Sequence, residues 1–264
     1  MIIRESDKLP TVELPSSELQ GKHLMQHPYD DMQFGAYYVT IEAGKEISLK
    51  GNVHKTPIEE IKYSHGYFCM DGVLTASSVT DKNSTMGPYI LKEGSFHMFP
   101  HSVTLVCNVE KKTTLIVIYV PEKDGSPAEN VISGALSDLQ KSKRCVDWGK
   151  GSSVRFLLEE DGYPISVTHC TYNDDSVRLE YDEFLKTNFF IKGSITVNYG
   201  SVGLEKSSDL TCSKDSVAMV SANENDRHCL LTSNNCQSIN IFSPALKGQE
   251  KHSWTSNEDY SDFS

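Results

Sequence analysis

Four histidines in the first half of the chain have the residue type and clustering of a metal site. His54, His65, His97 and His101 lie within one segment, with Glu59 and Glu60 between the first two. Imidazole is a common ligand of zinc, iron, copper and nickel, and ligands from separate strands can converge on one ion. The alternative for each histidine is an exposed or hydrogen-bonded imidazole without a ligand. The sequence makes this group a candidate metal site and leaves that alternative open.

Several other chemistries lack their sequence motifs. We find no Walker loop, dinucleotide fingerprint or nucleophile elbow, so phosphoryl and hydride transfer are not expected. The seven cysteines are scattered, without a Cys-x-x-Cys pair. This pattern argues against zinc fingers and redox motifs and predicts reduced thiols.

The charge and hydropathy of the chain restrict its partners. Its 264 residues carry a net charge of −11, which argues against binding to nucleic acid or to an anionic membrane surface. The strongest apolar run, residues 114–120, is too short to span a bilayer, and the N-terminal residues lack the pattern of an export signal. We therefore expect a cytoplasmic protein whose partner is a small molecule, with a homodimer as the default assembly.

The elements that must position these side chains are mostly β-strands. Short runs rich in β-branched and aromatic residues, bounded by Gly, Asn, Asp and Pro, predict antiparallel all-β domains. Apolar residues recur at helical spacing only in residues 128–143. That stretch predicts a short helical connector in the middle of the chain.

Three segments of the first half recur in the second half in the same order. The segments around Gly72, Ser95 and Pro121 match segments that follow them by 121, 121 and 123 residues. This regular offset indicates a tandem duplication. Each unit resembles a cupin in its order: a strand pair around a Gly turn, a variable loop, a segment that opens Gly-Ser or Asp-Ser, and a closing strand before Pro. We therefore predict an all-β fold of tandem cupin (jelly-roll-like) β-barrels, with an N-terminal barrel and helical connector at 1–145. A C-terminal barrel at 146–255 and an acidic tail at 256–264 complete the expected domains.

Three stretches of the second half resemble ectoine synthase, a single-cupin metal-dependent cyclase. They are residues 153–162, 225–229 and 241–252. The last is the most specific, because the family has a similar Phe-x-Pro-x-Leu-x-Gly-x-Glu-x-His sequence. The overall layout, through residues 120–139, resembles the bicupin ureidoglycine aminohydrolases.

The ectoine synthase resemblance implies a substrate pocket in the C-terminal barrel. Arg155, Tyr181 and Phe242 match positions with which the family holds substrate or shapes its pocket. Glu250 and His228 would transfer protons.

The resemblance also implies a metal site, which this sequence changes. The family's Glu, Tyr and His ligands fall on Lys186, on Ala218 or Val220, and on His228, so two of three ligands are missing. An inward Lys186 ammonium could replace the charge of a cation toward an anionic ligand; the alternative is a lysine that faces solvent.

The first barrel shows the opposite pattern at the equivalent positions. His65 falls at the place of the family's Glu ligand and His97 at the place of its Tyr ligand. His54, His101 or a glutamate would complete a site for a divalent transition metal, Fe, Zn or Mn.

Three functions remain open from the sequence. The leading hypothesis is an ectoine-synthase-like lyase or cyclase for an amino-acid-derived substrate, with or without metal. The second is a non-catalytic bicupin that binds or senses a small ligand. The third is a metal-dependent aminohydrolase of the ureidoglycine type.

Overall fold

The structure is a computed structural model, and it describes most of the chain. The described residues are 1–15, 17–26, 33–55, 60–80, 85–122, 130–173, 175–179, 185–200, 206–213, 215–222 and 228–248, with the backbone alone at 52–55, 60, 80, 85–86 and 175–179.

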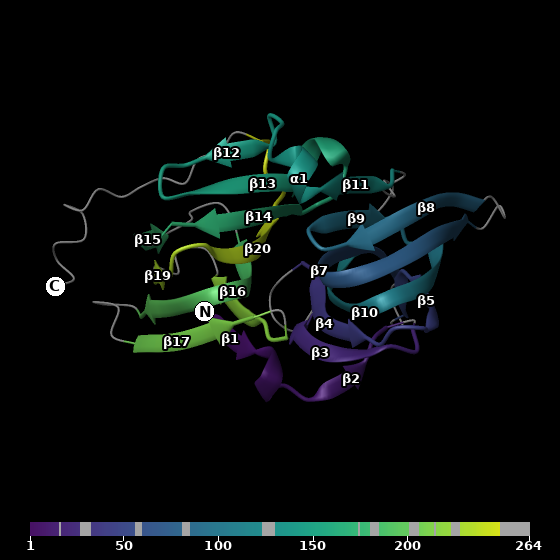
Figure 1. The fold of residues 1–264 in the computed structure, drawn as a ribbon, viewed down its shortest axis with the longest axis horizontal. Helices are drawn as coiled ribbons and strands as arrows, with labels where there is room; N and C mark the ends of the chain where they lie inside the picture. The colour runs from purple at the N-terminus through teal and green to yellow at the C-terminus, as the bar shows by residue number, and fades with distance from the viewer. Residues whose placement is uncertain are drawn as a thin grey trace. The chain divides into compact units, whose positions relative to one another are not determined.

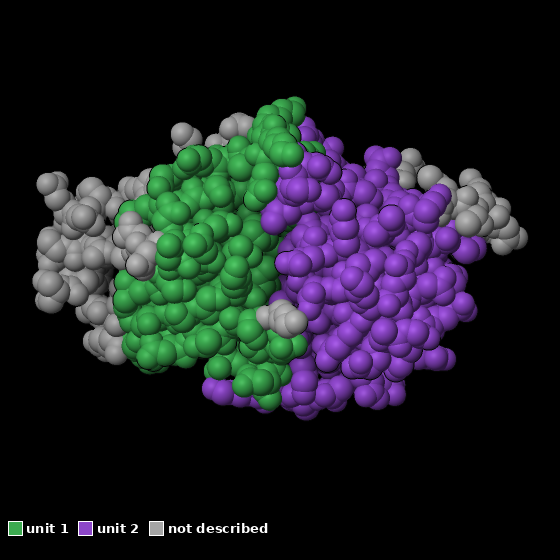
Figure 2. Space-filling view, viewed as in Figure 1, with its two compact units in different colours: residues 1–7, 139–159, 165–264 green, residues 8–138, 160–164 purple. Residues whose placement is uncertain are grey.

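The chain forms two compact units, coloured separately in Figure 2. One, here called the N-terminal barrel, comprises Lys8–Asp138 and Glu160–Pro164. The other, here called the C-terminal barrel, comprises Met1–Asp7, Leu139–Glu159 and Ile165–Ser264. The first seven residues of the chain therefore belong to the same unit as its second half.

The N-terminal barrel contains a ten-stranded antiparallel sheet (Figure 1). Its strand order is β11-β9-β7-β10-β4-β3-β2, and β5, β6 and β8 pair outside this path. The bounds are β2 (Thr11–Glu13), β3 (Gln20–Met25), β4 (Gly35–Ile41), β5 (Glu46–Lys50), β6 (Asn52–Lys55), β7 (Glu60–Thr80), β8 (Thr85–Lys92), β9 (Ser95–Phe99), β10 (Val103–Pro121) and β11 (Ile132–Ala135).

The C-terminal barrel contains a second ten-stranded antiparallel sheet. Its order is β1-β18-β16-β20-β14-β13-β12, and β15, β17 and β19 pair outside this path. The bounds are β1 (Ile2–Glu5), β12 (Cys145–Asp147), β13 (Gly151–Leu157), β14 (Ser166–Tyr172), β15 (Asp175–Leu179), β16 (Leu185–Tyr199), β17 (Lys206–Cys212), β18 (Ala218–Ala222), β19 (His228–Thr232) and β20 (Cys236–Ser243).

The two strand orders correspond one to one. The long strands β7 and β16 occupy the same place, as do β10 and β20, and β9 and β18. In the N-terminal barrel β11 pairs with β9. The corresponding partner of β18 in the C-terminal barrel is β1, which comes from the N-terminus of the chain. This correspondence confirms the tandem all-β fold predicted from the repeat.

The connector is less helical than the sequence predicted. Residues 132–135 form strand β11, which pairs with β9, and the helix α1 is limited to Leu136–Leu139. The unpaired edge of β9 offers backbone groups that a strand can satisfy and a helix cannot, so pairing overrides the helical spacing of the apolar residues. Short 3-10 helices occur at Ser6–Lys8 and Glu159–Asp161.

The alternation of side chains along each strand decides what can meet inside a barrel. Successive residues point to opposite faces, so one residue in two reaches the interior. In the N-terminal barrel the inward residues form a large apolar core that includes Tyr37, Tyr63, Tyr67, Phe99 and Tyr119. The inward positions of the C-terminal barrel combine an apolar core with buried polar residues.

Candidate functional site

His65 is a buried histidine whose two ring nitrogens both have protein partners. Nε2 lies 3.0 Å from the Val103 carbonyl oxygen and therefore donates to it, while Nδ1 lies 2.5 Å from the Tyr67 hydroxyl. Burial raises the pKa of Tyr67 well above its usual value, so the phenol stays protonated and donates to Nδ1. Burial also lowers the pKa of His65 to about 4, against a smaller raising effect of the Val103 hydrogen bond. His65 is thus a neutral, fully hydrogen-bonded imidazole at neutral pH.

His97 has the same arrangement one strand away. Its Nε2 lies 3.2 Å from the Ile90 carbonyl oxygen and its Nδ1 lies 2.9 Å from the Ser133 hydroxyl. Burial lowers the pKa of His97. Since the Ile90 oxygen can only accept, Nε2 carries the proton and Nδ1 accepts from Ser133.

His101 pairs with a carboxylate near the end of the same barrel. Its Nδ1 lies 2.9 Å from Glu122 Oε2, and Glu122 Oε1 also accepts from the Ser64 hydroxyl and from the His101 backbone N–H. His54 lies in β6, in a stretch where the structure describes only the backbone.

These contacts do not fit a metal held by His65 and His97. A metal ligand needs a free nitrogen lone pair, and the Nδ1 lone pairs of both histidines are used by hydroxyl donors. Within the described ranges, His, Cys, Asp and Glu form no group of three or more that could hold a metal ion. In this arrangement His65 and His97 are not available as metal ligands.

The C-terminal barrel presents Lys186 on its inward face. Phe190 belongs to the buried core, and alternation along β16 places Lys186 and Asn188 on the same face. Lys186 is 1% exposed, and its Nζ lies 5.5 Å from the centre of the Phe242 ring, its cross-strand neighbour. Burial lowers the pKa of Lys186 to about 8, partly offset by Cys170. Lys186 therefore faces the interior of the barrel and not solvent.

Arg155 stands in the same lumen, in a row of inward residues that crosses four strands. The register places Arg155 opposite Thr168, Thr168 opposite Asn240, and Asn240 opposite Asn188. Arg155 is 4% exposed and the other three are still less exposed. A guanidinium offers paired donors that match a carboxylate, so Arg155 suits an anionic group.

A hydrogen-bonded network fills the layer beside this row, around the sulfur of Cys170. The Asn240 Nδ2 donates to Cys170 Sγ at 3.0 Å, and the Ser153 and Thr168 hydroxyls lie 3.1 and 3.7 Å from the same sulfur. Trp148 Nε1 donates to Ser153 Oγ at 3.0 Å. Sequence reasoning missed this network, because isolated Ser, Thr, Asn and Cys residues in strands carry no motif.

Asn240 is saturated by this network. Its Oδ1 accepts from the Ser238 hydroxyl at 2.6 Å, and its Nδ2 also reaches the Tyr172 hydroxyl at 3.4 Å. The Ser238 hydroxyl donates its proton to Asn240. The Tyr172 hydroxyl, 3.1 Å from Ser238 Oγ, therefore donates to Ser238. Such a network fixes the side chains that line the lumen.

The remaining predicted residues are only partly described. His228 is 1% exposed and lies on β19, where alternation places it on the same face as the core residue Leu230. Tyr181 and Glu250 lie outside the described residues. The structure thus places Arg155, Lys186 and Phe242 on the inward face of the same sheet, with Lys186 directly opposite Phe242 and Arg155 two strands further on.

The ligand positions implied by ectoine synthase do not fit a metal in the C-terminal barrel. Lys186 carries an ammonium without a free lone pair when protonated. Ala218 and Val220 are apolar members of the buried core. Among these positions only His228 remains as a metal ligand.

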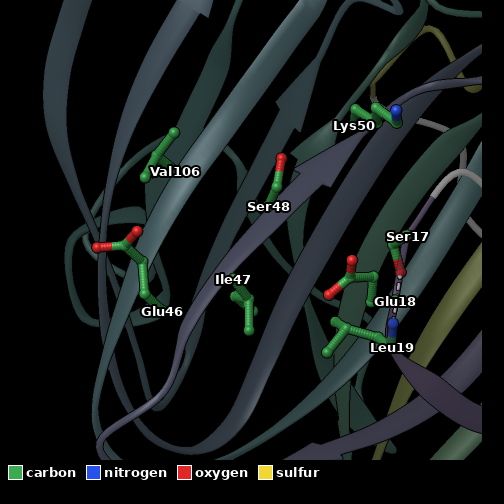
Figure 3. A pocket seen from close by; sticks show the side chains of 8 residues that line it. All are labelled: Ser17, Glu18, Leu19, Glu46, Ile47, Ser48, Lys50 and Val106. Carbon is green, nitrogen blue, oxygen red and sulfur yellow. Dashed lines mark hydrogen bonds between the residues drawn. The ribbon is translucent and has the colours of Figure 1, made fainter.

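Surface cavities lie on both barrels. The larger of two, of about 540 Å³, borders the strand β5 of the N-terminal barrel (Figure 3). Its lining combines two carboxylates, one ammonium, two hydroxyls and three apolar side chains, from Ser17, Glu18, Leu19, Glu46, Ile47, Ser48, Lys50 and Val106. The other, of about 370 Å³, lies over β16, β17 and β19. The described lining of these two cavities includes no residue predicted from the sequence.

The fold and these lumens define a bicupin, and comparison with solved structures agrees. Protein Ylba from E. coli, matched to the family model DUF861, aligns over 91% of this chain and 89% of its own, with 14% identity and a TM-score of 0.64. Oxalate decarboxylase from B. subtilis, which has Mn(II) centers, aligns over 95% of this chain and 78% of its own, with 8% identity and a TM-score of 0.62. At these identities the likeness shows the fold alone.

The C-terminal half carries a more particular similarity. Residues 131–260 match the family model of ectoine synthase. A comparison with curated proteins gave no match. Among the described residues, no helix is long and apolar enough to cross a membrane. Together, the family match and the fold support a cupin-type enzyme or binding protein for a small molecule.

Proposed function

We propose that the C-terminal barrel binds an amino-acid-derived carboxylate and closes a ring with loss of water, as in ectoine synthase, without a metal. The observation that carries this proposal is the buried, inward Lys186 at the position of the family's Glu ligand. Removing an ammonium from water costs free energy. A lysine buried at this position therefore favours a role in binding or catalysis. A strongly shifted pKa inside a lumen is a mark of functional groups.

The contrast between the two lumens supports this choice of barrel. His65 and Tyr67 of the N-terminal barrel face Tyr119, Phe99 and other core aromatics. In the C-terminal barrel, Asn188 takes the place of Tyr67 and Ala222 that of Phe99, while Phe242 keeps an aromatic ring at the place of Tyr119. Smaller and more polar side chains suit a polar ligand, whereas aromatic side chains fill the N-terminal lumen.

The residues have distinct roles in the proposed reaction. The Arg155 guanidinium binds the substrate carboxylate through paired hydrogen bonds. The substrate amine attacks the carbonyl carbon, and the Lys186 ammonium protonates the carbonyl oxygen as the C–N bond forms. His228, or Glu250, accepts a proton from the attacking nitrogen. The group that took this proton, His228 or Glu250, returns it to the new hydroxyl, which leaves as water, and the neutral Lys186 amine takes the remaining proton from nitrogen as the C=N bond forms in the ring.

The pKa of Lys186 suits this role. At about 8 it leaves the ammonium mostly protonated at pH 7, yet more acidic than an ordinary lysine. An acid whose pKa lies near the working pH transfers its proton most effectively. The buried site also excludes bulk water, which would compete for the same hydrogen bonds.

The test is turnover of N-acetyl-2,4-diaminobutyrate by purified protein, followed by mass spectrometry for loss of water. We expect a cyclised product from wild type and none from Lys186→Met. The matched control is Lys192→Met, which changes an exposed lysine of the same strand. A compound that raises the melting temperature and is recovered unchanged would contradict catalysis and establish a binding protein.

A further inference from the structure

One buried polar atom of the C-terminal lumen has no hydrogen-bond partner in the described part of the chain. This atom is Oδ1 of Asn188, whose side chain is 0% exposed. The amide orientation is set by Nδ2, which donates to the Val220 carbonyl oxygen at 3.4 Å. A buried acceptor without a donor costs about 1–3 kcal/mol and calls for an explanation such as a ligand.

The neighbour across the strand pair shows what a satisfied asparagine looks like in the same lumen. Asn240 lies directly opposite Asn188, is equally buried, and uses both its oxygen and its nitrogen in the network with Ser238, Cys170 and Tyr172. Of these two opposed asparagines, Asn240 has a donor to its carbonyl oxygen and Asn188 has none.

Donor and acceptor counting indicates the chemistry that would satisfy this oxygen. Arg155 and a protonated Lys186 supply only donors to the lumen, so they match the acceptors of a ligand, such as a carboxylate. An amino-acid-derived ligand also carries N–H donors, which need an acceptor. The inward hydroxyls of Ser153 and Ser238 are already engaged within the network. Asn188 Oδ1 is the complementary group.

We infer that Asn188 determines ligand specificity by accepting a hydrogen bond from an N–H group of the bound molecule. This inference rests on the proposed function and names the substrate class more narrowly, as a carboxylate with an amide or amine N–H within reach of the lumen. It requires no turnover.

Two probes that differ in a single group test this inference. 4-Acetamidobutanoate carries a carboxylate and an amide N–H, and 4-acetoxybutanoate replaces that N–H by an ester oxygen. Neither has the second amine needed for ring closure. We expect wild type to bind the amide about tenfold more tightly than the ester by calorimetry, and Asn188→Leu to bind both equally.

The melting temperatures of the ligand-free proteins provide a second test. Asn188→Leu removes one long hydrogen bond, from Nδ2 to Val220, together with the unsatisfied oxygen, and these two effects oppose each other. Asn188→Leu should therefore melt close to wild type, whereas Asn240→Leu, which breaks several satisfied bonds, should melt about 2–4 °C lower or more.

Each other outcome overturns the inference. An amide preference that survives in Asn188→Leu, equal binding of both probes by wild type, or binding of neither would remove the role of Asn188. Destabilisation of Asn188→Leu as large as that of Asn240→Leu would show that the oxygen has a partner within the protein. Failure of the proposed function is a separate result, because amide-selective binding without cyclisation of N-acetyl-2,4-diaminobutyrate contradicts only the ring closure.

Discussion

His65 and Lys186 occupy the same position in the two barrels. Each lies equally far before a turn glycine, Gly72 or Gly193, and each faces inward between two neighbouring strands. His65 is neutral and hydrogen-bonded among aromatic side chains. Lys186 is a buried amine in a more polar lumen. The duplication has thus produced one closed, aromatic interior and one polar interior.

Replacement of Lys186 by Met should stabilise the ligand-free protein. The native fold lowers the pKa of this lysine from 10.5 to about 8, so it disfavours the charged form by roughly 3 kcal/mol. Between pH 8 and 10.5 the unfolded chain binds more protons than the native one, so wild-type stability should rise with pH there. The Lys186→Met variant should lack this rise. Chemical denaturation at pH 7, 9 and 10 measures both effects, and a less stable variant at pH 7 would contradict them.

Replacement of Arg155 by Gln should weaken binding of carboxylates. The loss of a paired, charged hydrogen bond costs about 1.5–3 kcal/mol, which raises the dissociation constant about tenfold to a hundredfold. Calorimetry with 4-acetamidobutanoate measures this change. Arg144→Gln is the control, because Arg144 donates to the Phe156 carbonyl oxygen instead. Equal loss in both variants would indicate a general effect on the fold.

Much of the fold could be predicted from the sequence, because the repeat shows which strands of the two halves correspond. This requires no knowledge of how the strands pair. The turn glycines Gly72 and Gly193 both adopt positive φ, 94° and 99°, as their shared motif suggests. The placement of Ile2–Glu5 beside β18 had no such signal. Four residues with ordinary β-propensity do not indicate which sheet edge they will join.

The candidate site was harder to predict, because it depends on cross-strand register. Arg155, Lys186 and Phe242 came from the resemblance to a family. Asn188 and Asn240 become a pair only when β16 and β20 are aligned residue by residue. A single-residue slip would place either on the opposite face, so sequence alone could not identify them.

We expect His65 and His97 of the N-terminal barrel to bind no transition metal. A metal on His65 and His97 would have to displace the hydroxyl donors Tyr67 and Ser133 from the Nδ1 atoms, or the carbonyl oxygens from the Nε2 protons. We expect the metal content of protein purified without an affinity-metal step to be the same in wild type and in a His65→Ala, His97→Ala double variant. One transition metal per wild-type chain, absent from the double variant, would contradict the observed hydrogen bonding.

Acid should destabilise the protein through its buried histidines. Burial lowers the pKa of His65 and of His169 to about 4, so between pH 6.5 and 4 the unfolded chain binds more protons than the native one. Stability is fully present above pH 6.5 and falls as the pH drops toward 4. His65→Gln should lose stability less steeply over this range, as measured by chemical denaturation. An NMR titration of the wild-type His65 ring near pH 6.5 would contradict this assignment.

The turn glycine Gly72 should tolerate no side chain, for two separable reasons. Its φ of 94° is unfavourable for other residues, and a Cβ there would overlap the Lys112 carbonyl oxygen and approach the Thr113 Cα to 2.6 Å. Gly44 has a φ of 78°, but a Cβ at that position would meet nothing within 4 Å, so it isolates the backbone effect. Gly44→Ala should cost about 1 kcal/mol, whereas Gly72→Ala should cost about 2 kcal/mol or more, because overlap adds to strain. Thermal unfolding of the two variants compares these costs directly, and equal destabilisation would mean that the β7–β10 contact at this turn yields without strain.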